Sequence, residues 1–308
     1  MIIYNTNTPV LFLVFNRPET TKMVYDAISL AKPKKLYIAA DGARTIEEDI
    51  ICAEVRAIFK KIDWDCEVKT LFRNENLGCK IAVSEAISWF FDNEKEGIIL
   101  EDDCLPSKSF FGFCSTLLEK YRNDNRVGHI GGANFQDGNL RGRQSYYFSR
   151  LTHVWGWASW RRVWQNYDVN MVSYSNFNLN NDLKNIPSHD VYSSNWILSF
   201  EGVYTHKINT WDYQYAYANL VNNYLSIVPN KNLVVNIGLG NGATHTSASH
   251  PFANMEQQNL TEITHPQFYI ASLEADWFTQ NKEFNIPDIK KRGLSKLWKK
   301  IKKAIKQK

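Results

Sequence analysis

The chain has 308 residues, of which 44% are hydrophobic and 22% are charged, and its 5 cysteines form no CxxC pair. This composition excludes a disordered or collagen-like chain and a disulfide-dense scaffold, and it leaves ample material for a core. The net charge of +4 arises from residues 290–308, which hold 10 of the 36 basic residues and no acidic residue. The remaining body has 26 basic and 32 acidic residues, a net charge of −6, which argues against nucleic acid as a partner.

Over the first hundred residues, short apolar runs alternate with segments of helical periodicity. We predict buried strands at residues 10–15, 36–40, 66–72 and 97–100. We predict helices that begin near Pro18 and that span residues 46–62 and 79–91. Strands that alternate with helices in this way are typical of βαβ units. We therefore expect an α/β fold in which a mainly parallel sheet is flanked by helices.

Polar and charged residues follow each of the four predicted strands. They are Asn16 and Arg17, Asp41 and Gly42, Arg73 and Asn74, and Glu101, Asp102 and Asp103. In parallel α/β sheets ligands bind beyond the carboxyl ends of the strands, so we expect these side chains to line a site. The sequence contains neither a GxGxxG motif after the first strand nor a GxxxxGK[ST] motif, so any nucleotide phosphates must be neutralised in another way.

Three consecutive acids, Glu101, Asp102 and Asp103, follow the fourth predicted strand. A divalent cation would relieve their mutual repulsion, and hard carboxylate oxygens favour Mg²⁺ or Mn²⁺. Such a cation can bridge to a diphosphate and stabilise it as a leaving group. A solvated acidic turn that precedes a helix near Ser107 is an equally good interpretation of these residues taken alone.

The second half of the chain is less regular and is rich in aromatic residues. Trp157, Trp160 and Trp164 recur at the i, i+3, i+7 spacing of a helix face, so we expect them to form a helical stripe in the core. Residues 170–189 are expected to form a polar surface excursion. Residues 238–242 contain three glycines and have the composition of a mobile loop.

A series of motifs occurs in an order that resembles a known family. The motifs are PVLFLVFNRP, YIAADG, NENLGCKIAVSEAI, IILEDDCLPSKSFFGFC, VWGWASWRRVW, WDYQY and NIGLGNGATHT. Together they resemble the GT-A glycosyltransferases related to the β-1,2-N-acetylglucosaminyltransferases of glycan branching, and the bacterial nucleotide-diphospho-sugar transferases that are similar to that group. The resemblance runs over residues 9–246 and implies a GT-A, Rossmann-like fold.

The resemblance also implies a division of the chain. The expected segments are a GT-A domain at 1–250, with a nucleotide-binding half at about 1–125 and an acceptor half at about 126–250, a C-terminal extension at 251–289, and the basic tail at 290–308.

On the donor side, the resemblance implies roles for five residues. Arg17 would contact the nucleotide and offset phosphate charge, and Asp41 would accept a hydrogen bond from a uracil N–H. Lys80 matches a basic residue near the nucleotide. Asp102 would lie near the ribose and Glu101 near the donor sugar. For Arg17, Asp41 and Lys80 the alternative is an ordinary surface charge on a loop.

The resemblance further implies a metal ligand and a catalytic base. Asp103 would bind Mn²⁺ or Mg²⁺. Glycosyl transfer with inversion needs a base that takes the proton of the acceptor hydroxyl, and Asp212, which follows Trp211, matches that base. Asp212 could instead cap the helix that it opens, or serve in both roles. Trp155 and Trp211 are candidates for the acceptor cleft, because indole rings stack on the apolar faces of sugars.

Residues 238–245 match the loop that closes over the donor in the resembling enzymes. The glycines would make this motion easy, and closure would exclude water from a donor that can hydrolyse. Gly240 would contact the donor, and His245 would touch the diphosphate or the metal. A solvated histidine is the alternative for His245.

These features predict an inverting, metal-dependent hexosyl- or N-acetylhexosaminyltransferase. It would move a sugar from a nucleotide-diphosphate donor, with a UDP-sugar favoured, to a hydroxyl of a glycan acceptor, as in the assembly of bacterial surface polysaccharide or lipid-linked glycan. Two alternatives stay open, a sugar nucleotidyltransferase on the same fold and a non-catalytic, membrane-docked glycan-binding protein. The nucleotidyltransferase needs a glycine-rich pyrophosphate loop after the first strand, which Asn16, Arg17 and Pro18 do not supply.

The basic tail, residues 290–308, has the pattern of an amphipathic helix. Its apolar face comprises Leu294, Leu297, Trp298, Ile301, Ala304 and Ile305. A helix with lysines on the other face is typical of attachment to an anionic membrane surface, although a nucleic-acid arm or a solvated tail would share the charge. The apolar run at residues 10–15 is too short to span a bilayer, and no basic residue precedes it as in a signal peptide. We therefore expect a cytoplasmic protein, peripheral on the inner face of the cell membrane.

Overall fold

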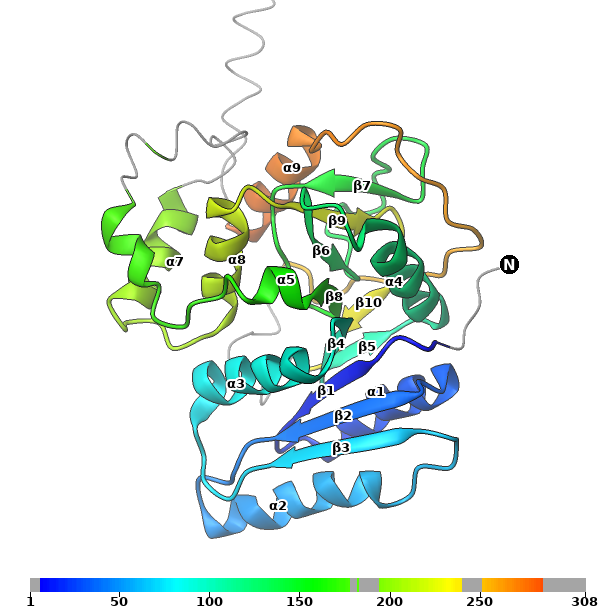
Figure 1. The fold of residues 1–308 in the computed structure, drawn as a ribbon, viewed down its shortest axis with the longest axis vertical. Coiled ribbons are helices and arrows are strands. Elements are labelled where there is room, and N and C mark those ends of the chain that lie inside the picture. Colours follow the sequence, from blue (N-terminus) through cyan, green and yellow to red (C-terminus); the bar gives the residue numbers. More distant parts are fainter. Residues whose placement is uncertain (1–5, 178–181, 183–193, 240–250, 285–308) are drawn as a thin grey trace, which may run out of the picture.

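The four strands predicted in the first hundred residues form one half of a central sheet. The computed structural model describes residues 6–177, 182, 194–239 and 251–284. The strands are β1 (Val10–Val14), β2 (Lys35–Ala40), β3 (Glu67–Phe72) and β4 (Glu96–Glu101). They are parallel and lie in the order β3-β2-β1-β4 (Figure 1). Every residue of β1 is buried, because helices cover both faces of the sheet, and this explains why its sequence is continuously apolar.

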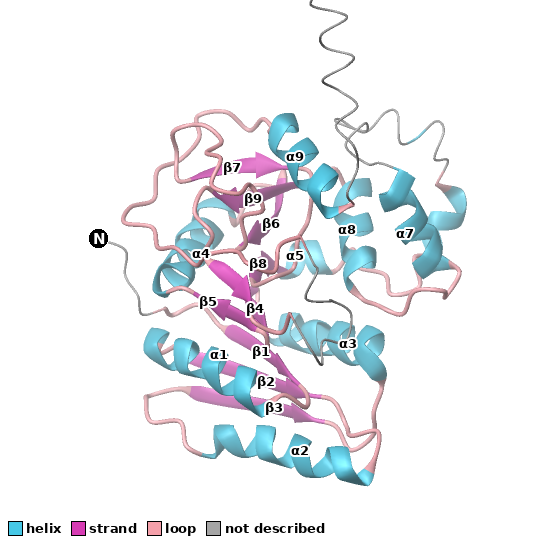
Figure 2. Ribbon diagram, turned by 180° about the vertical axis from the view of Figure 1, so that it is seen from behind, coloured by secondary structure: helices cyan, strands magenta, loops and turns pink. Residues whose placement is uncertain are grey.

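The helices between these strands begin where the sequence predicts. They are α1 (Pro18–Ala31), α2 (Ile46–Ala57), α3 (Gly78–Asn93) and, after β4, α4 (Lys108–Tyr121). Pro18 occupies the first turn of α1, where a missing N–H costs nothing, and the Thr45 side chain caps α2 by accepting a hydrogen bond from the Glu48 N–H. Helices α1 and α3 cover opposite faces of the β1–β4 half (Figures 1 and 2).

The other half of the sheet comes from the irregular second half of the chain. Its strands are β6 (Val127–Gly131), β7 (Tyr146–Ser149), β8 (Trp157–Trp160) and β9 (Leu225–Pro229). The described residues thus form an eight-stranded sheet in the order β3-β2-β1-β4-β8-β6-β9-β7. Only β7 and β8 in this sheet run antiparallel to their neighbours, so the predicted α/β architecture with a mainly parallel sheet is confirmed.

The helical stripe predicted for the tryptophans is wrong, although their place in the core is confirmed. Trp157 and Trp160 lie in β8, between β4 and β6, and Trp164 ends the short helix α5 (Arg161–Trp164). A strand in the middle of a covered sheet buries both faces, so Trp157 and Trp160 are both in the core although they point to opposite sides. Because both faces of β8 are buried, its sequence lacks the alternation of apolar and polar residues by which a half-exposed strand is recognised.

Three helices of the second half pack beside the sheet. They are α7 (Ser194–Tyr204), α8 (Asp212–Val221) and α9 (Leu273–Glu283). Trp196, Phe200, Tyr217 and Leu220 join α7 and α8 in a second apolar cluster, which lies next to the sheet (Figure 1). Two short strands, β5 (Cys104–Pro106) and β10 (Val234–Asn236), form an antiparallel ribbon directly after β4.

Several predicted features lie outside the described residues. These are most of the polar excursion at 170–189, the loop from residue 240 to 245, and the basic tail at 290–308. Within the described part of the chain, no helix combines the length and the apolar character needed to cross a membrane.

Candidate active site

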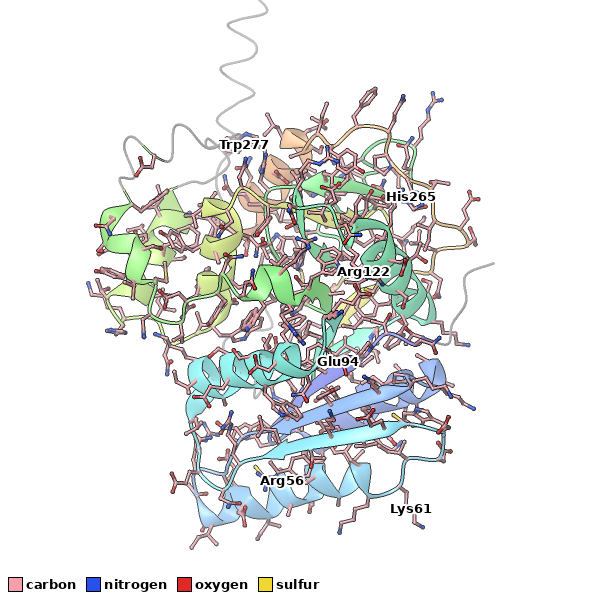
Figure 3. The ribbon with its side chains drawn as sticks, in the orientation of Figure 1. Arg56, Lys61, Glu94, Arg122, His265 and Trp277 are labelled. Atoms are coloured by element: carbon pink, nitrogen blue, oxygen red, sulfur yellow. The ribbon has the colours of Figure 1, made fainter. Side chains whose placement is uncertain are left out.

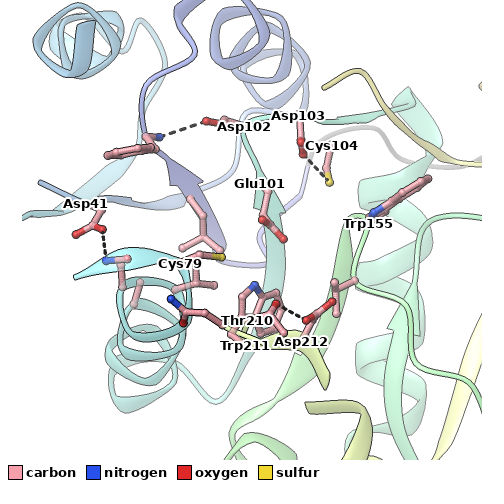
Figure 4. A pocket seen from close by; sticks show the side chains of 18 of the residues that line it. Asp41, Cys79, Glu101, Asp102, Asp103, Cys104, Trp155, Thr210, Trp211 and Asp212 are labelled. Atoms are coloured by element: carbon pink, nitrogen blue, oxygen red, sulfur yellow. Dashed lines mark hydrogen bonds between the residues drawn. The ribbon is translucent and has the colours of Figure 1, made fainter. Parts of the chain in front are cut away.

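A cavity of about 1000 Å³ opens at the carboxyl ends of β1, β2 and β4. Ten of the residues singled out from the sequence line it: Asn16, Arg17, Asp41, Arg73, Glu101, Asp102, Asp103, Trp155, Trp211 and Asp212. They come from the strand ends on one side and from the second half of the chain on the other, so the fold brings them together across one space (Figure 4). Lys80 does not line the cavity, and Gly240 and His245 lie outside the described residues.

The two aspartates that follow β4 are held close to a single guanidinium group. Arg17 Nη1 lies 2.9 Å from Asp103 Oδ2 and 3.5 Å from Asp102 Oδ1. The backbone N–H of Phe15 also donates to Asp102 Oδ2, at 3.3 Å. Both anchors belong to the segment between β1 and α1, so the chain uses the end of β1 to fix the acids that end β4.

The positive charge of Arg17 does not balance the acids. Burial, followed by the negative charge of Asp103, raises the pKa of Asp102 to about 7. Burial also raises the pKa of Glu101 well above its ordinary value, with contributions from Asp103, Asp102 and Asp212. Among the described residues, the acids therefore lack enough positive charge nearby to stay fully ionised near pH 7, and a bound cation would favour their ionised forms.

The donor set fits a hard divalent cation that also has ligands outside the protein. Carboxylate oxygens are the ligands that Mg²⁺ and Mn²⁺ prefer. Among the described residues, no group of three His, Cys, Asp or Glu side chains is arranged to hold a metal by itself. Mg²⁺ characteristically uses one or two carboxylates and completes its shell with water and substrate phosphates. The acidic motif suits that mode of binding, and Asp103 as the ligand stays a prediction.

The strand pair β5–β10 brings a glycine against the Asp103 carboxylate. The Ile237 N–H donates to the Asp103 carbonyl at 2.8 Å, which fixes the segment after β10 beside the motif. A Cβ on Gly238 would lie 2.5 Å from Asp103 Oδ2, so only glycine leaves this side chain in place. Gly238, the first residue of the predicted mobile loop, is therefore needed for close packing against Asp103.

Asp41 has a local function that its sequence position did not indicate. Its carboxylate accepts hydrogen bonds from the backbone N–H groups of Leu77 and Gly78, each at about 3.0 Å, and from the Asn76 side chain. The chain before α3 is thereby attached to the end of β2. Close approach here also requires Gly42, because a Cβ on it would lie 2.3 Å from the Glu75 carbonyl carbon.

A side chain of α2, Arg56, holds the same loop. The Arg56 guanidinium of α2, labelled in Figure 3, donates to the carbonyls of Asp41 and Arg73 at 3.0 and 2.7 Å. The side of the cavity that holds Asp41 is therefore formed by a loop that two other elements hold in place. A uracil contact through Asp41 stays a prediction, and such a contact would share oxygens that already accept several hydrogen bonds.

The start of α3 presents Cys79, rather than Lys80, to the cavity. Burial, assisted by the negative charges of Glu101, Asp212 and Asp41, raises the pKa of the Cys79 thiol to about 12. A thiol with so high a pKa stays neutral near pH 7, so Cys79 is a wall residue and not a nucleophile. Lys80 is half-buried in the first turn of α3, and its predicted role near the nucleotide stays a prediction.

Asp212 faces the acidic motif from the opposite side of the cavity. It is the first residue of α8, as predicted, while Trp211 occupies the N-cap position. Asp212 Oδ1 accepts hydrogen bonds from the Thr210 hydroxyl and from the Tyr213 N–H, the latter at 3.0 Å (Figure 4). No described residue donates to Oδ2, so one carboxylate oxygen is fixed by the protein and the other is available to a ligand.

The two tryptophans predicted for the acceptor cleft differ in their surroundings. Trp211 is only 2% exposed, and its ring stacks on Trp157 with centroids 6.0 Å apart, so most of it belongs to the core. Trp155 is half-buried and packs against Phe135, which in turn packs against Phe252, with centroids 5.3 and 4.6 Å apart. These three aromatic residues form a wall of the cavity.

Other lining residues escaped the sequence analysis. Phe135, Phe252 and Glu283 come from segments far apart in the chain and follow no recognisable motif. Asn236 also lines the cavity, and its Oδ1 accepts a hydrogen bond from the Gly238 N–H at 2.9 Å. Asn236 begins the NIGLGNGATHT motif, which is the signal that could have identified it, whereas only the tertiary fold brings Phe135, Phe252 and Glu283 to the cavity.

Comparison with known proteins identifies no family. No protein-family model matches the chain, and comparison with the sequences of curated proteins gives no match. Solved structures with some likeness include HddC from Yersinia pseudotuberculosis, with 9% sequence identity and a TM-score of 0.32 over 52% of this chain and 80% of that chain. A 4-diphosphocytidyl-2C-methyl-D-erythritol synthase from Anaerococcus prevotii shows 10% identity and a TM-score of 0.35, over 57% of this chain and 80% of its own.

A UDP-glucose pyrophosphorylase, solved with UDP-glucose, shows 10% identity and a TM-score of 0.31, over 52% of this chain and 78% of that chain. Because these scores are low, the likeness does not decide between functions. The functional argument rests on the site itself.

Proposed function

We propose that the chain is an inverting, metal-dependent glycosyltransferase that uses a nucleotide-diphosphate sugar, with a UDP-sugar favoured. The observation that carries the proposal is a single cavity with two different walls. One wall holds a cluster of acids, in which the pKa values of Glu101 and Asp102 are raised, and the facing wall holds a separate carboxylate, Asp212. The first arrangement suits a cation with a diphosphate, and the second suits a base for an acceptor hydroxyl. The cavity is also large enough for a sugar nucleotide together with part of an acceptor.

In this proposal the chain's own residues position two substrates. Arg17 would contact phosphate oxygens, and the support is its position after β1, where it lines the cavity beside the carboxylates of Asp102 and Asp103. When bound to the acidic motif, Mn²⁺ or Mg²⁺ would supply positive charge that stabilises the departing diphosphate. Asp212 would take the proton of the acceptor hydroxyl at Oδ2, while Thr210 and the Tyr213 N–H hold Oδ1 and so fix the direction of the free oxygen.

The local structure favours transfer of a sugar over formation of a sugar nucleotide. β1 ends at Val14 and α1 begins at Pro18, so only three residues, none of them glycine, join the two elements. This link leaves no room for a glycine-rich loop around the phosphates of a nucleoside triphosphate. The sugar nucleotidyltransferase is therefore the second candidate, and it is retained because it would need the same cluster of acids.

Product analysis separates these reactions. The protein is incubated with Mn²⁺ and, in one series, with UDP-sugars and glycan acceptors, and in another with UTP and sugar 1-phosphates. We expect acceptor-dependent release of UDP in the first series and no pyrophosphate in the second. Release of pyrophosphate would support the nucleotidyltransferase, and donor binding without turnover would support a glycan-binding protein.

We further propose that the basic tail attaches the enzyme to an anionic membrane, where a lipid-linked glycan would be its acceptor. The support is the sequence pattern of residues 290–308, which lie outside the described residues. The tail deletion given in the Discussion tests this part separately.

A further inference from the structure

Glu283 contributes a carboxylate to the cavity that none of the roles given above uses. It is the last residue of α9 and lines the cavity together with Asp212. Its Oε2 atom is buried and has no hydrogen-bond partner among the described residues. The Glu283 side chain as a whole is half-buried, but a buried carboxylate oxygen without a hydrogen-bond partner is unfavourable, so the position of Oε2 requires an explanation.

A shared aromatic contact holds Glu283 on the same side of the cavity as Asp212. The Trp196 indole of α7 packs against Tyr213 and against Phe284, with ring centroids 5.9 and 5.7 Å apart. Tyr213 follows Asp212 in the chain, and Phe284 follows Glu283. Trp196 therefore fixes the backbone that carries both acids, although they come from helices far apart in the sequence.

Three features make this position unfavourable for an acid. Glu283 lies at the C-terminus of α9, where the partial negative charge of the helix dipole repels a carboxylate. It lies near Asp212, and burial together with that charge raises the pKa of Glu283 to about 8. It also lacks a cationic partner among the described residues. Residues that oppose local stability in several ways at once are concentrated at functional sites.

We propose that Glu283 binds a hydroxyl group of the acceptor sugar, next to the hydroxyl that Asp212 activates. A carboxyl group accepts hydrogen bonds in either protonation state and can also donate one when it is protonated, and the hydroxyls of a sugar ring can both donate and accept. Asp212 and Glu283 together would hold two hydroxyls of one ring and so orient the attacking oxygen. The inference rests on the proposed function, because that function makes this wall the acceptor side.

The first test needs no ligand. Glu283→Gln removes a buried charge but keeps the shape of the side chain, so we expect its melting temperature at pH 8.5 to exceed that of the wild type. Glu274→Gln, at the other end of α9, is the matched control. Glu274 is paired with Arg141 and lies at the helix N-terminus, so its loss should lower the melting temperature. A lower melting temperature for Glu283→Gln would assign Glu283 a structural role and overturn the proposal.

The second test measures binding by titration calorimetry in the presence of UDP and Mn²⁺. The probes are the methyl glycosides of glucose, galactose, mannose and N-acetylglucosamine. We expect at least one to bind the wild type, to bind Glu283→Ala about tenfold more weakly or worse, and to bind Glu274→Gln normally. The affinity for UDP should be the same in all three proteins.

The outcomes of this titration distinguish a failure of the proposed function from a failure of the role proposed for Glu283. If the wild type does not bind UDP with Mn²⁺, the proposed function fails and this inference fails with it. If UDP binds but no glycoside binds the wild type, or Glu283→Ala keeps wild-type glycoside affinity, only the role of Glu283 is refuted.

Discussion

At the scale of single residues, the site is defined by what each carboxylate already contacts. Asp103 and Asp102 share one arginine, Asp41 accepts hydrogen bonds from a backbone loop, and the described residues hold Asp212 by Oδ1 alone. Identical functional groups are thus assigned different tasks by their partners. The second oxygen of Asp212 has no donor among the described residues, and Asp212 lies across the cavity from the acidic motif, so it is the residue to test as the base.

Asp212→Asn should separate donor binding from transfer. Asparagine keeps the size of the side chain and can still accept hydrogen bonds from Thr210 and the Tyr213 N–H at Oδ1, but it does not take a proton. We expect transfer to fall by roughly 10²-fold or more while the affinity for the UDP-sugar persists. Steady-state kinetics together with donor titration measure both quantities. An equal loss of donor affinity and turnover would instead indicate a structural role.

At the scale of secondary-structure elements, the junctions between strands and helices determine the site. The loop before α3 is attached to β2 through Asp41 and to α2 through Arg56. The ribbon β5–β10 places Gly238 against Asp103. These attachments keep polar side chains directed at the cavity although they lie at the ends of separate elements.

Asp41→Ala tests the attachment of the loop. The substitution leaves the N–H groups of Leu77 and Gly78 without their acceptor, so we expect the free energy of unfolding to fall by about 2 kcal/mol. Asp65→Ala, which removes an exposed partner of Lys34, should change it by less than about 1 kcal/mol. Denaturant titration measures both. If Asp41→Ala is as stable as the wild type but no longer binds UDP, the Asp41 carboxylate contacts the uracil ring and does not support the loop.

The elements of the first hundred residues could be predicted because each carries its own signal. Strands such as β1 and β2 are apolar runs that polar or charged residues follow closely, and their parallel order follows from the helices between them. Strands β6 to β9 have four or five residues each and pair with strands distant in the chain. No local sequence pattern indicates such pairing. The spacing of Trp157, Trp160 and Trp164 is even that of a helix face.

The same distinction applies to the site. Residues directly after predicted strands, such as Arg17 and Asp103, could be expected at the sheet edge from topology alone. The facing wall, with Phe135, Phe252 and Glu283, arises from loops and a helix end, so it became visible only in the structure. Sequence also could not show that Asp41 is occupied by backbone donors or that Trp211 is mostly core.

At the scale of the whole molecule, burial of ionisable groups should make stability depend on pH. His129 of β6 is buried beside Trp157, and burial lowers its pKa to about 3 from an ordinary value of 6.5. Between about pH 6.5 and pH 3, His129 is therefore protonated in the unfolded chain but neutral in the folded chain. His129 thus costs no stability above pH 6.5 and an increasing amount as the pH falls from 6.5 towards 3.

His129→Phe isolates this effect from the other titrating groups. Denaturant titration of the variant and the wild type at pH 7.5 and pH 5.5 gives the difference in their stability at each pH. We expect that difference to shift in favour of the variant by roughly 1.4 kcal/mol per pH unit once the pH is below 6.5. The same difference at both pH values would show that His129 can be protonated in the folded protein.

Deletion of residues 290–308 tests the proposed membrane attachment. The deletion removes ten positive charges and an apolar stripe but none of the described residues that line the cavity, so we expect transfer to a soluble acceptor to survive. Binding to liposomes with anionic lipid should be lost. In the intact protein that binding should weaken as salt rises, because the attraction is screened over about 8 Å at physiological ionic strength. Sedimentation with liposomes is the measurement, and a truncated protein that still sediments would place the attachment elsewhere.

The most direct test of the central claim is a thermal-shift measurement of the wild type and Asp103→Ala with UDP-, GDP-, CMP- and dTDP-sugars, each with Mn²⁺ or with EDTA. A ligand at a hundredfold excess over its Kd stabilises a protein by about 2.7 kcal/mol, so a true donor should be distinct from the rest. We predict that one class of nucleotide sugar raises the melting temperature of the wild type with Mn²⁺, and that EDTA or Asp103→Ala abolishes the shift without lowering the melting temperature of the free protein by much. A chain that no nucleotide sugar stabilises, or that is stabilised equally in EDTA and in Asp103→Ala, would contradict the account.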